Sequence, residues 1–117
     1  MKAKRMKLLS ICLLAIAGLC GCSKPLPQDK LSYIGEWQSE DMYLLILADG
    51  SVSYKRLKNG STTTINAPLK EFDGDDFVVG FAFFTTIFDV SQTPQKSNDR
   101  WTMVVDGVTL TKPVENK

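Results

Sequence analysis

Four dipeptides of the Asn-Gly or Asp-Gly type divide the chain after Tyr33 into short pieces, at Asp49-Gly50, Asn59-Gly60, Asp73-Gly74 and Asp106-Gly107. Such pairs favour the positive φ angles of two-residue type I′ turns, whose geometry matches the twist of paired strands. No helical period of useful length occurs between them. The region from Tyr33 onward is therefore predicted to be an antiparallel meander of short strands.

The side chains beside three of these turns support hairpins, because each hairpin acquires one more apolar face. A two-residue loop pairs Leu45 with Tyr54 at the first turn, Tyr54 with Ile65 at the second and Met103 with Leu110 at the last. Strands are expected at about 34–39, 42–48, 52–58, 61–66, 68–72, 77–80, 82–90, 100–105 and 108–112, some of them merging. We expect an all-β fold closed as a small β-barrel, with a two-layer β-sandwich as the alternative.

Six phenylalanines crowd one part of the chain, namely Phe72, Phe77, Phe81, Phe83, Phe84 and Phe88. Both alternating sets of residues between 77 and 90 are apolar, which is typical of a strand buried on both faces. A β-bulge at Gly80 would re-aim part of this run. The second interpretation is an aromatic surface for an apolar ligand or partner.

The first residues resemble a targeting segment. Four cationic residues (Lys2, Lys4, Arg5 and Lys7) precede a mostly apolar run from Leu8 to Leu19. A membrane-spanning helix needs about 20 apolar residues. This shorter run fits the apolar region of a secretory signal peptide over residues 1–21.

The end of that run, Leu19-Cys20-Gly21-Cys22, resembles the lipobox of bacterial lipoproteins. The resemblance implies cleavage before Cys22, with Leu19 at position −3, Gly21 at −1 and a diacylglycerol on the Cys22 thiol. It also implies attachment to the membrane through lipid chains, several of which hold a protein firmly. Ser23 is not the aspartate that resembles an inner-membrane retention signal, so the resemblance implies the outer membrane, facing the periplasm.

Loss of the leader changes the chemistry of the chain. Four of the fourteen cationic residues leave with it, so the net charge of +1 becomes negative. Cys12 and Cys20 leave as well and Cys22 takes the lipid, so no disulfide is expected. Residues 22–32, which hold Pro25 and Pro27, are expected to form an extended tether before a β domain over 33–117.

Within the β domain, Gly35-Glu36-Trp37 is similar to the Gly-x-Trp motif of lipocalins, in which the tryptophan closes the barrel floor. More broadly, residues 33–112 resemble small bacterial lipoproteins with a compact lipocalin-like domain. The chain departs from lipocalins in being too short for eight long strands and in lacking a second signature. The broader resemblance carries no known activity, and the plainer interpretation of Trp37 is an ordinary core residue. An alternative is a lipocalin-like cup for a small apolar ligand, with a lining of Trp37, Tyr43, Leu45, Tyr54 and Phe81.

Composition excludes several classes of chemistry. The chain has no histidine, so Ser-His-Asp and Cys-His nucleophiles and His-ligated metals are excluded. No basic stripe points to nucleic acid. Asp73, Asp75 and Asp76 lack EF-hand spacing and favour a polar turn over a calcium site. The polar segment 92–99 is expected to be an exposed loop. We expect no catalytic residue, metal or cofactor.

These observations predict an outer-membrane lipoprotein that is not an enzyme. Its β domain is expected to serve as a binding or accessory module of the cell envelope, with the membrane and an envelope protein as partners. One alternative is a lipocalin-like carrier of a small apolar ligand. A second alternative is a periplasmic inhibitor of a host enzyme such as lysozyme.

Overall fold

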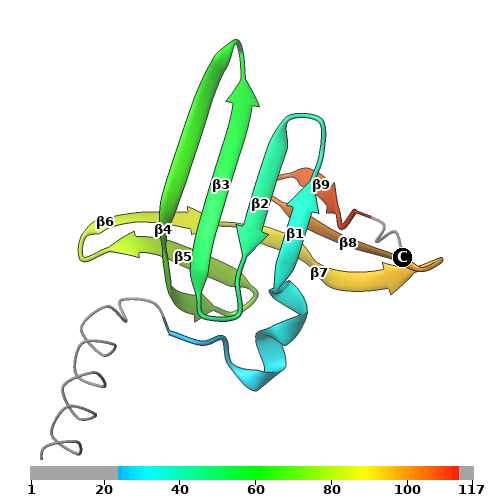
Figure 1. Cartoon of the computed structure of the whole chain (residues 1–117), viewed down its shortest axis with the longest axis horizontal. Helices are drawn as coiled ribbons and strands as arrows, with labels where there is room; N and C mark the ends of the chain where they lie inside the picture. Colours follow the sequence, from blue (N-terminus) through cyan, green and yellow to red (C-terminus); the bar gives the residue numbers. More distant parts are fainter. Residues whose placement is uncertain (1–23, 114–117) are drawn as a thin grey trace, which may run out of the picture.

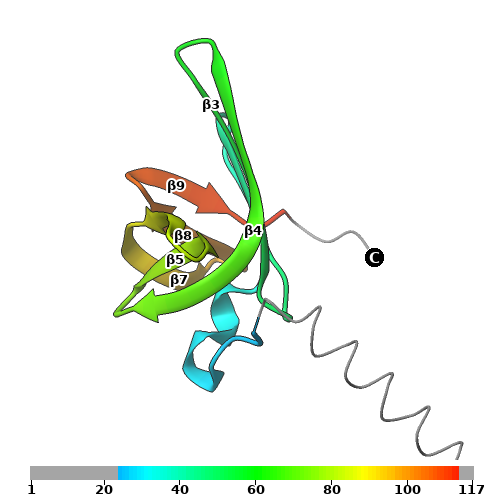
Figure 2. The same cartoon turned by 90° about the vertical axis from the view of Figure 1, so that its left-hand side faces the viewer.

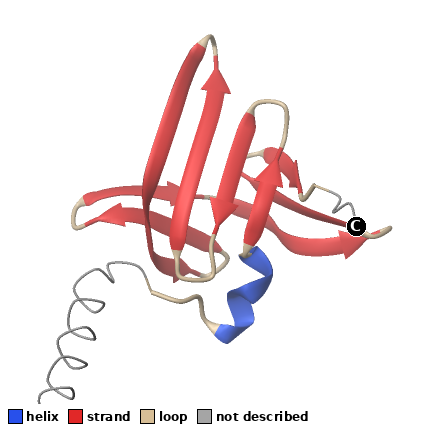
Figure 3. Ribbon diagram, in the orientation of Figure 1, coloured by secondary structure: helices blue, strands red, loops and turns tan. Residues whose placement is uncertain are grey.

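Nine antiparallel strands and one 3₁₀ helix make up the computed structural model, which describes residues 24–113 (Figure 1, Figure 3). The elements are η1 (Gln28–Tyr33), β1 (Gly35–Gln38), β2 (Met42–Ile46), β3 (Ser51–Lys58), β4 (Ser61–Asp73), β5 (Asp76–Phe81), β6 (Phe84–Phe88), β7 (Val90–Ser97), β8 (Arg100–Val105) and β9 (Val108–Thr111). The all-β prediction is confirmed.

All nine strands of the described region belong to one sheet, in the order β6-β5-β4-β3-β2-β1-β9-β8-β7. Strand β4 is the longest and bends along its length, so that its first part pairs with β3 and its last part with β5 (Figure 2). A register shift between Leu69 and Glu71 marks this region of β4. β4 therefore belongs to two arms of the sheet, one formed with β1–β3 and the other with β5 and β6. Its bend places β5 and β6 across the inner face of β1–β4, so the sheet curls on itself.

The curled sheet is an open half-barrel, so closure into a barrel is only partly confirmed. Strands β6 and β7 lie at the two ends of the strand order and are not paired with each other. They are nevertheless consecutive in the chain, with only Asp89 between them. The Asp76 carboxylate accepts a hydrogen bond from the Val90 N–H at 2.7 Å, and the Asp106 carboxylate accepts one from the Asp89 N–H at 2.9 Å. These bonds fix the crossing without closing the sheet.

The inner face of the half-barrel holds the core. Its largest buried side chains are Trp37, Tyr33, Phe77, Phe88, Leu44, Ile46, Met103 and Leu110. Phe88 stacks on Phe77 with ring centroids 5.0 Å apart and meets Tyr54 edge-on at 4.9 Å, so β6 packs against β3 across the interior. Burial of these rings is the main source of stability, because the described residues hold one long ion pair and no buried charged side chain.

The turn signals predict three of the four turns where they occur. Asn59-Gly60 and Asp106-Gly107 have positive φ at both residues, and the predicted pairs Tyr54–Ile65 and Met103–Leu110 are confirmed. A third turn at Gly74, where Asp73 pairs with Asp76, joins β4 to β5. The ranges 61–66 and 68–72 merge into β4.

The predicted register of the β2–β3 hairpin is wrong by one residue. Residues 47–50 form a four-residue connection, in which Gly50 donates to the Leu47 carbonyl. Leu44, not Leu45, therefore pairs with Tyr54. Since side chains alternate between faces, this shift turns Leu45 to the outer face and Leu44 into the core.

Two segments predicted to be irregular are ordered. The polar segment 92–99, expected to be an exposed loop, belongs largely to strand β7, an edge strand in which Pro94 is tolerated because one side of its backbone is unpaired. The extended tether expected over 22–32 is not found in the part that the structure describes: Leu26 is buried in the core and η1 occupies all of 28–33. The β domain thus begins before Tyr33.

Candidate functional site

The aromatic run folds back on itself as the β5–β6 hairpin instead of forming one buried strand. Phe81 pairs with Phe84 across a two-residue turn of Ala82 and Phe83, and Ala82 has a φ of 49°. Gly80 takes a φ of 143°, and a Cβ there would lie 2.1 Å from the Phe84 carbonyl oxygen. Glycine therefore permits the close approach of β5 and β6 just before the turn.

Four apolar side chains of this hairpin are exposed, and we call them the aromatic tip. Phe83 is 83% exposed, Phe84 74%, Ile87 65% and Phe81 51%. The Phe83 and Phe84 rings pack on each other, with centroids 4.6 Å apart. Phe81 and Phe84 share a face with the buried pair Phe77–Phe88 further along the hairpin, so the core face continues outward with no cover from the described residues.

The aromatic tip lies at the end of the molecule where the described chain begins. The Lys70 ammonium donates to the Ala82 carbonyl at 2.8 Å, which ties the tip to β4. The neighbouring Leu69 N–H donates to the Gly50 carbonyl at 2.7 Å. A Cβ on Gly50 would lie 2.1 Å from the backbone oxygen of Lys24. Figure 1 shows the blue start of the coloured chain and the β5–β6 hairpin on the same side of the view.

The structure separates the five residues predicted to line an apolar pocket. Trp37 and Tyr54 are buried in the core. Tyr43 and Leu45 point to the outer face, because they alternate with the buried Met42, Leu44 and Ile46 of β2. Phe81 belongs to the aromatic tip.

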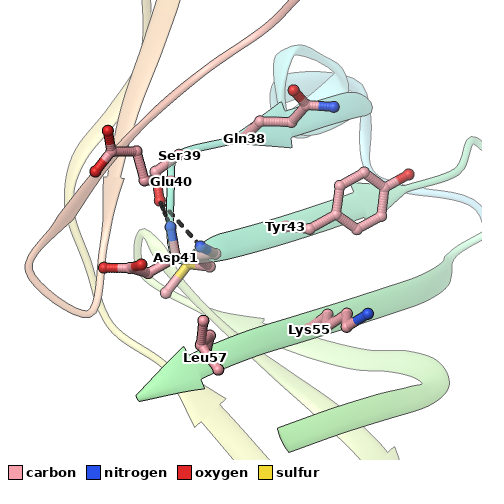
Figure 4. Close-up of a pocket in the computed structure, with 8 residues that line it drawn as sticks. Gln38, Ser39, Glu40, Asp41, Tyr43, Lys55 and Leu57 are labelled. Atoms are coloured by element: carbon pink, nitrogen blue, oxygen red, sulfur yellow. Dashed lines mark hydrogen bonds between the residues drawn. The ribbon is translucent and has the colours of Figure 1, made fainter. Parts of the chain in front are cut away.

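A shallow groove on the outer face contains Tyr43. It has a volume of about 260 Å³ and is lined by Gln38, Ser39, Glu40, Asp41, Met42, Tyr43, Lys55 and Leu57 (Figure 4). The Ser39 hydroxyl accepts hydrogen bonds from the N–H groups of Asp41 and Met42, so it shapes the β1–β2 turn. The Glu40 and Asp41 carboxylates are directed away from Tyr43 (Figure 4). This arrangement brings no set of acid and base groups together around one point.

The hydroxyl of Tyr43, at this groove, has a shifted pKa. It donates to Glu36 at 2.9 Å. Partial burial, followed by the hydrogen bond and the negative charge of Glu36, raises the pKa of Tyr43. The phenol therefore stays protonated at neutral pH and acts as a donor to the carboxylate.

The three aspartates considered for calcium serve the turn and the packing around it. The Tyr33 hydroxyl donates to the Asp75 carbonyl at 2.8 Å, and Asp76 holds the start of β7. Burial and the nearby charges of Asp75, Asp76 and Asp29 raise the pKa of Tyr33 to about 12. Residues 24–113 contain no group of three acidic, histidine or cysteine side chains placed to hold a metal ion.

Lys112 lies between two tryptophans, at the end of β9. Its ammonium is 4.9 Å from the Trp37 ring centroid and 5.1 Å from that of Trp101, and it donates to the Ile34 carbonyl at 2.9 Å. Burial lowers the pKa of Lys112. These contacts tie the end of β9 to the start of β1, and the two strands pair with each other only at Gln38 and Thr111.

No protein family, curated protein or solved structure matches the chain. No helix in residues 24–113 is long and apolar enough to cross a membrane. Leu19, Cys20, Gly21 and Cys22, the residues that resemble a lipobox, lie outside the described residues. The aromatic tip is the candidate functional site, and only the crowding of phenylalanines in the sequence pointed to it.

Proposed function

We propose that this protein is a lipoprotein of the bacterial cell envelope, in the outer membrane and facing the periplasm, that acts as a binding module and not as an enzyme. Lipid on Cys22 attaches it to the membrane. The aromatic tip is the binding surface.

The observation that carries the binding role is the exposure of neighbouring aromatic side chains on one short hairpin. A folded domain gains free energy by burying phenylalanine, so a cluster left in water marks a surface that another molecule covers. The hairpin also holds Ala82 at a positive φ, a conformation that costs a residue with a Cβ about 1 kcal/mol. The fold keeps this turn although it presents Phe83 and Phe84 to solvent.

The leader supports the attachment. A cationic start, a short apolar run and the Leu19-to-Cys22 sequence occur together and in the order that export and lipidation require. The buried Leu26 supports a short link between lipid and domain, because only three residues separate it from Cys22.

Attachment is tested by growing cells that express the full chain with radiolabelled palmitate. Label is expected in the wild type, and Cys22→Ala should abolish it together with flotation in membrane fractions. Cys20→Ser is the matched control, since it changes a neighbouring thiol of the same leader and should keep the label. Equal label in Cys22→Ala would refute the attachment.

The binding surface is tested with a photoreactive phenylalanine analogue at position 84 in intact cells. An adduct with another molecule, protein or lipid, is expected there. The same analogue at Leu57, an exposed position in β3 far from the tip, should give none. Absence of an adduct at position 84 would refute the assignment of the site.

A further inference from the structure

We infer that the aromatic tip inserts into the boundary between the headgroups and acyl chains of the membrane that carries the lipid anchor. The inference rests on the proposed lipidation of Cys22, and it names the chemical class that covers the tip: phospholipid. Phenylalanine side chains at a membrane surface bury apolar area against acyl chains while the backbone of a short turn stays near the headgroups.

Chain length limits how far the anchor can lie from the end of the molecule that carries the tip. Two residues of backbone span at most about 7 Å, so the Cys22 backbone lies within that distance of Lys24. Lys24 is held against Gly50, Gly50 is bonded to Leu69, and Lys70 is bonded to Ala82 in the tip. The hairpin projects past β4 on this side of the molecule (Figure 1).

Charge at this end favours an anionic lipid surface. Lys24 and Lys70 are both exposed and flank the path from the anchor to the tip. Asp49 is the acidic residue in the β2–β3 connection, and its carboxylate accepts a hydrogen bond from the Ser51 N–H. The two lysines would be attracted to anionic headgroups.

The distribution of exposed apolar groups favours lipid over a second copy of the chain. A second copy that paired edge to edge would use the main-chain groups along β6, and this pairing would leave the Phe83 ring, which lies in the turn beyond the strand, uncovered. The most exposed rings, Phe83 and Phe84, are instead at the projecting turn. A projection of this kind needs only weak intrinsic affinity, because the anchor keeps it at high local concentration near the bilayer.

The test places a tryptophan in the tip of the full lipidated protein. Phe83→Trp protein is reconstituted into vesicles of phosphatidylethanolamine and phosphatidylglycerol, with or without bromine on the acyl chains. The emission of Trp37 and Trp101, measured in the parent protein, is subtracted. The added indole is expected to shift to the blue and to lose most of its emission with brominated lipid. Leu57→Trp, matched in size and exposed in β3, should stay unquenched.

The outcomes separate the inference from the proposed function. Flotation with the vesicles but an unquenched, red-shifted signal from Phe83→Trp refutes tip insertion and leaves the anchor standing. A blue shift without bromine quenching also refutes it, because the tip is then covered by protein. Failure to float refutes the anchor and the insertion together. A second measurement uses the lipidated protein without any substitution. Amide hydrogen exchange at residues 82–85 should slow on vesicles, while that at residues 59–61 should not change.

Discussion

Gly50 shows how one residue can fix where the β domain begins. Its φ is 92°, and a Cβ there would meet the Lys24 carbonyl oxygen at 2.1 Å, with backbone atoms on both sides of the contact. We expect Gly50→Ala to lower the free energy of unfolding by about 2–4 kcal/mol, because it combines an unfavourable φ with a backbone clash. Urea unfolding measures the change.

Gly60→Ala is the matched control for this prediction. Gly60 also has a positive φ, of 79°, but no atom lies within 4 Å of the position of an added Cβ. Only the conformational cost of about 1 kcal/mol should remain. Equal losses in the two variants would mean that the contact with Lys24 does not hold the start of the domain.

Tyr33 gives stability a dependence on alkaline pH. Its folded pKa, about 12, is above the ordinary value of 10.0. The folded state therefore keeps a proton that the unfolded state loses, so the free energy of unfolding falls as pH rises from 10 to 12. Tyr33→Phe should remove this part of the decline and should cost about 1 kcal/mol at neutral pH, through loss of the bond to Asp75.

The measurement is chemical denaturation at intervals between pH 8 and 12, read as the difference between the wild type and Tyr33→Phe. The lowered pKa of Lys112 acts in the opposite sense below pH 10.5, because its folded state releases the proton first. That effect is common to both proteins and cancels in the difference. A difference that stays constant across the range would show that Tyr33 ionises normally.

Among the elements, the β7–β8 hairpin has a turn that the sequence did not signal. Asn98 and Asp99 have φ values of 54° and 63°, the conformation that Asn-Gly adopts in the β3–β4 hairpin. Asp99→Gly should therefore raise the free energy of unfolding by about 0.5–1 kcal/mol and the melting temperature by a few degrees.

Gly107→Ala is the reverse experiment in the β8–β9 hairpin. Gly107 has a φ of 79° and open space around it, so an alanine should lower the melting temperature by a similar amount. Calorimetry on the three proteins checks both signs. A lower melting temperature for Asp99→Gly would show that the aspartate side chain stabilises the turn by more than its φ costs.

Sequence predicts hairpins well where the turn residues alone decide the register. At Asn59-Gly60 and Asp106-Gly107 they do, because positive φ is needed at both positions. At Asp49-Gly50 a four-residue connection forms instead, because Gly50 also makes contacts outside the hairpin. It packs against the backbone of Lys24, and its carbonyl accepts a hydrogen bond from the Leu69 N–H. The one-residue shift exchanges the two faces of β2, so Tyr43 and Leu45 no longer lie on the side where the pocket was predicted.

Strand β7 and the exposure of the aromatic tip were also difficult to predict from the sequence. A polar segment with a proline carries no strand pattern, but an edge strand needs only one bonded side and accepts register shifts such as those at Gln92. The phenylalanine run marked the right part of the chain. Its exposure depends on the turn at Ala82 and Phe83, which contains no glycine to announce it.

On the scale of the whole molecule, Phe88 joins the two arms of the curled sheet. It lies in β6, is fully buried, and contacts Tyr54 of β3 and Phe77 of β5. Phe88→Ala should lower the free energy of unfolding by about 3–5 kcal/mol, because it removes the ring that both arms share. The loss should affect the whole domain in one transition.

Ile87→Ala is the control beside it, since Ile87 is 65% exposed and should change stability by less than about 0.5 kcal/mol. Near-ultraviolet circular dichroism and tryptophan fluorescence should report the same midpoint for Phe88→Ala. Separate midpoints would show that β5 and β6 detach while the sheet around Trp37 survives, and the half-barrel would then be two cooperative units.

The long β3–β4 ribbon ends at Asn59-Gly60, away from the blue start of the coloured chain and from the hairpin of β5 and β6 (Figure 1). Gly60 has no neighbour that an inserted peptide would displace. If the domain faces the periplasm as proposed, an epitope spliced between Asn59 and Gly60 should bind antibody only after the outer membrane is permeabilised. This turn is thus the natural place for a label that reports, in living cells, which side of a membrane the domain occupies.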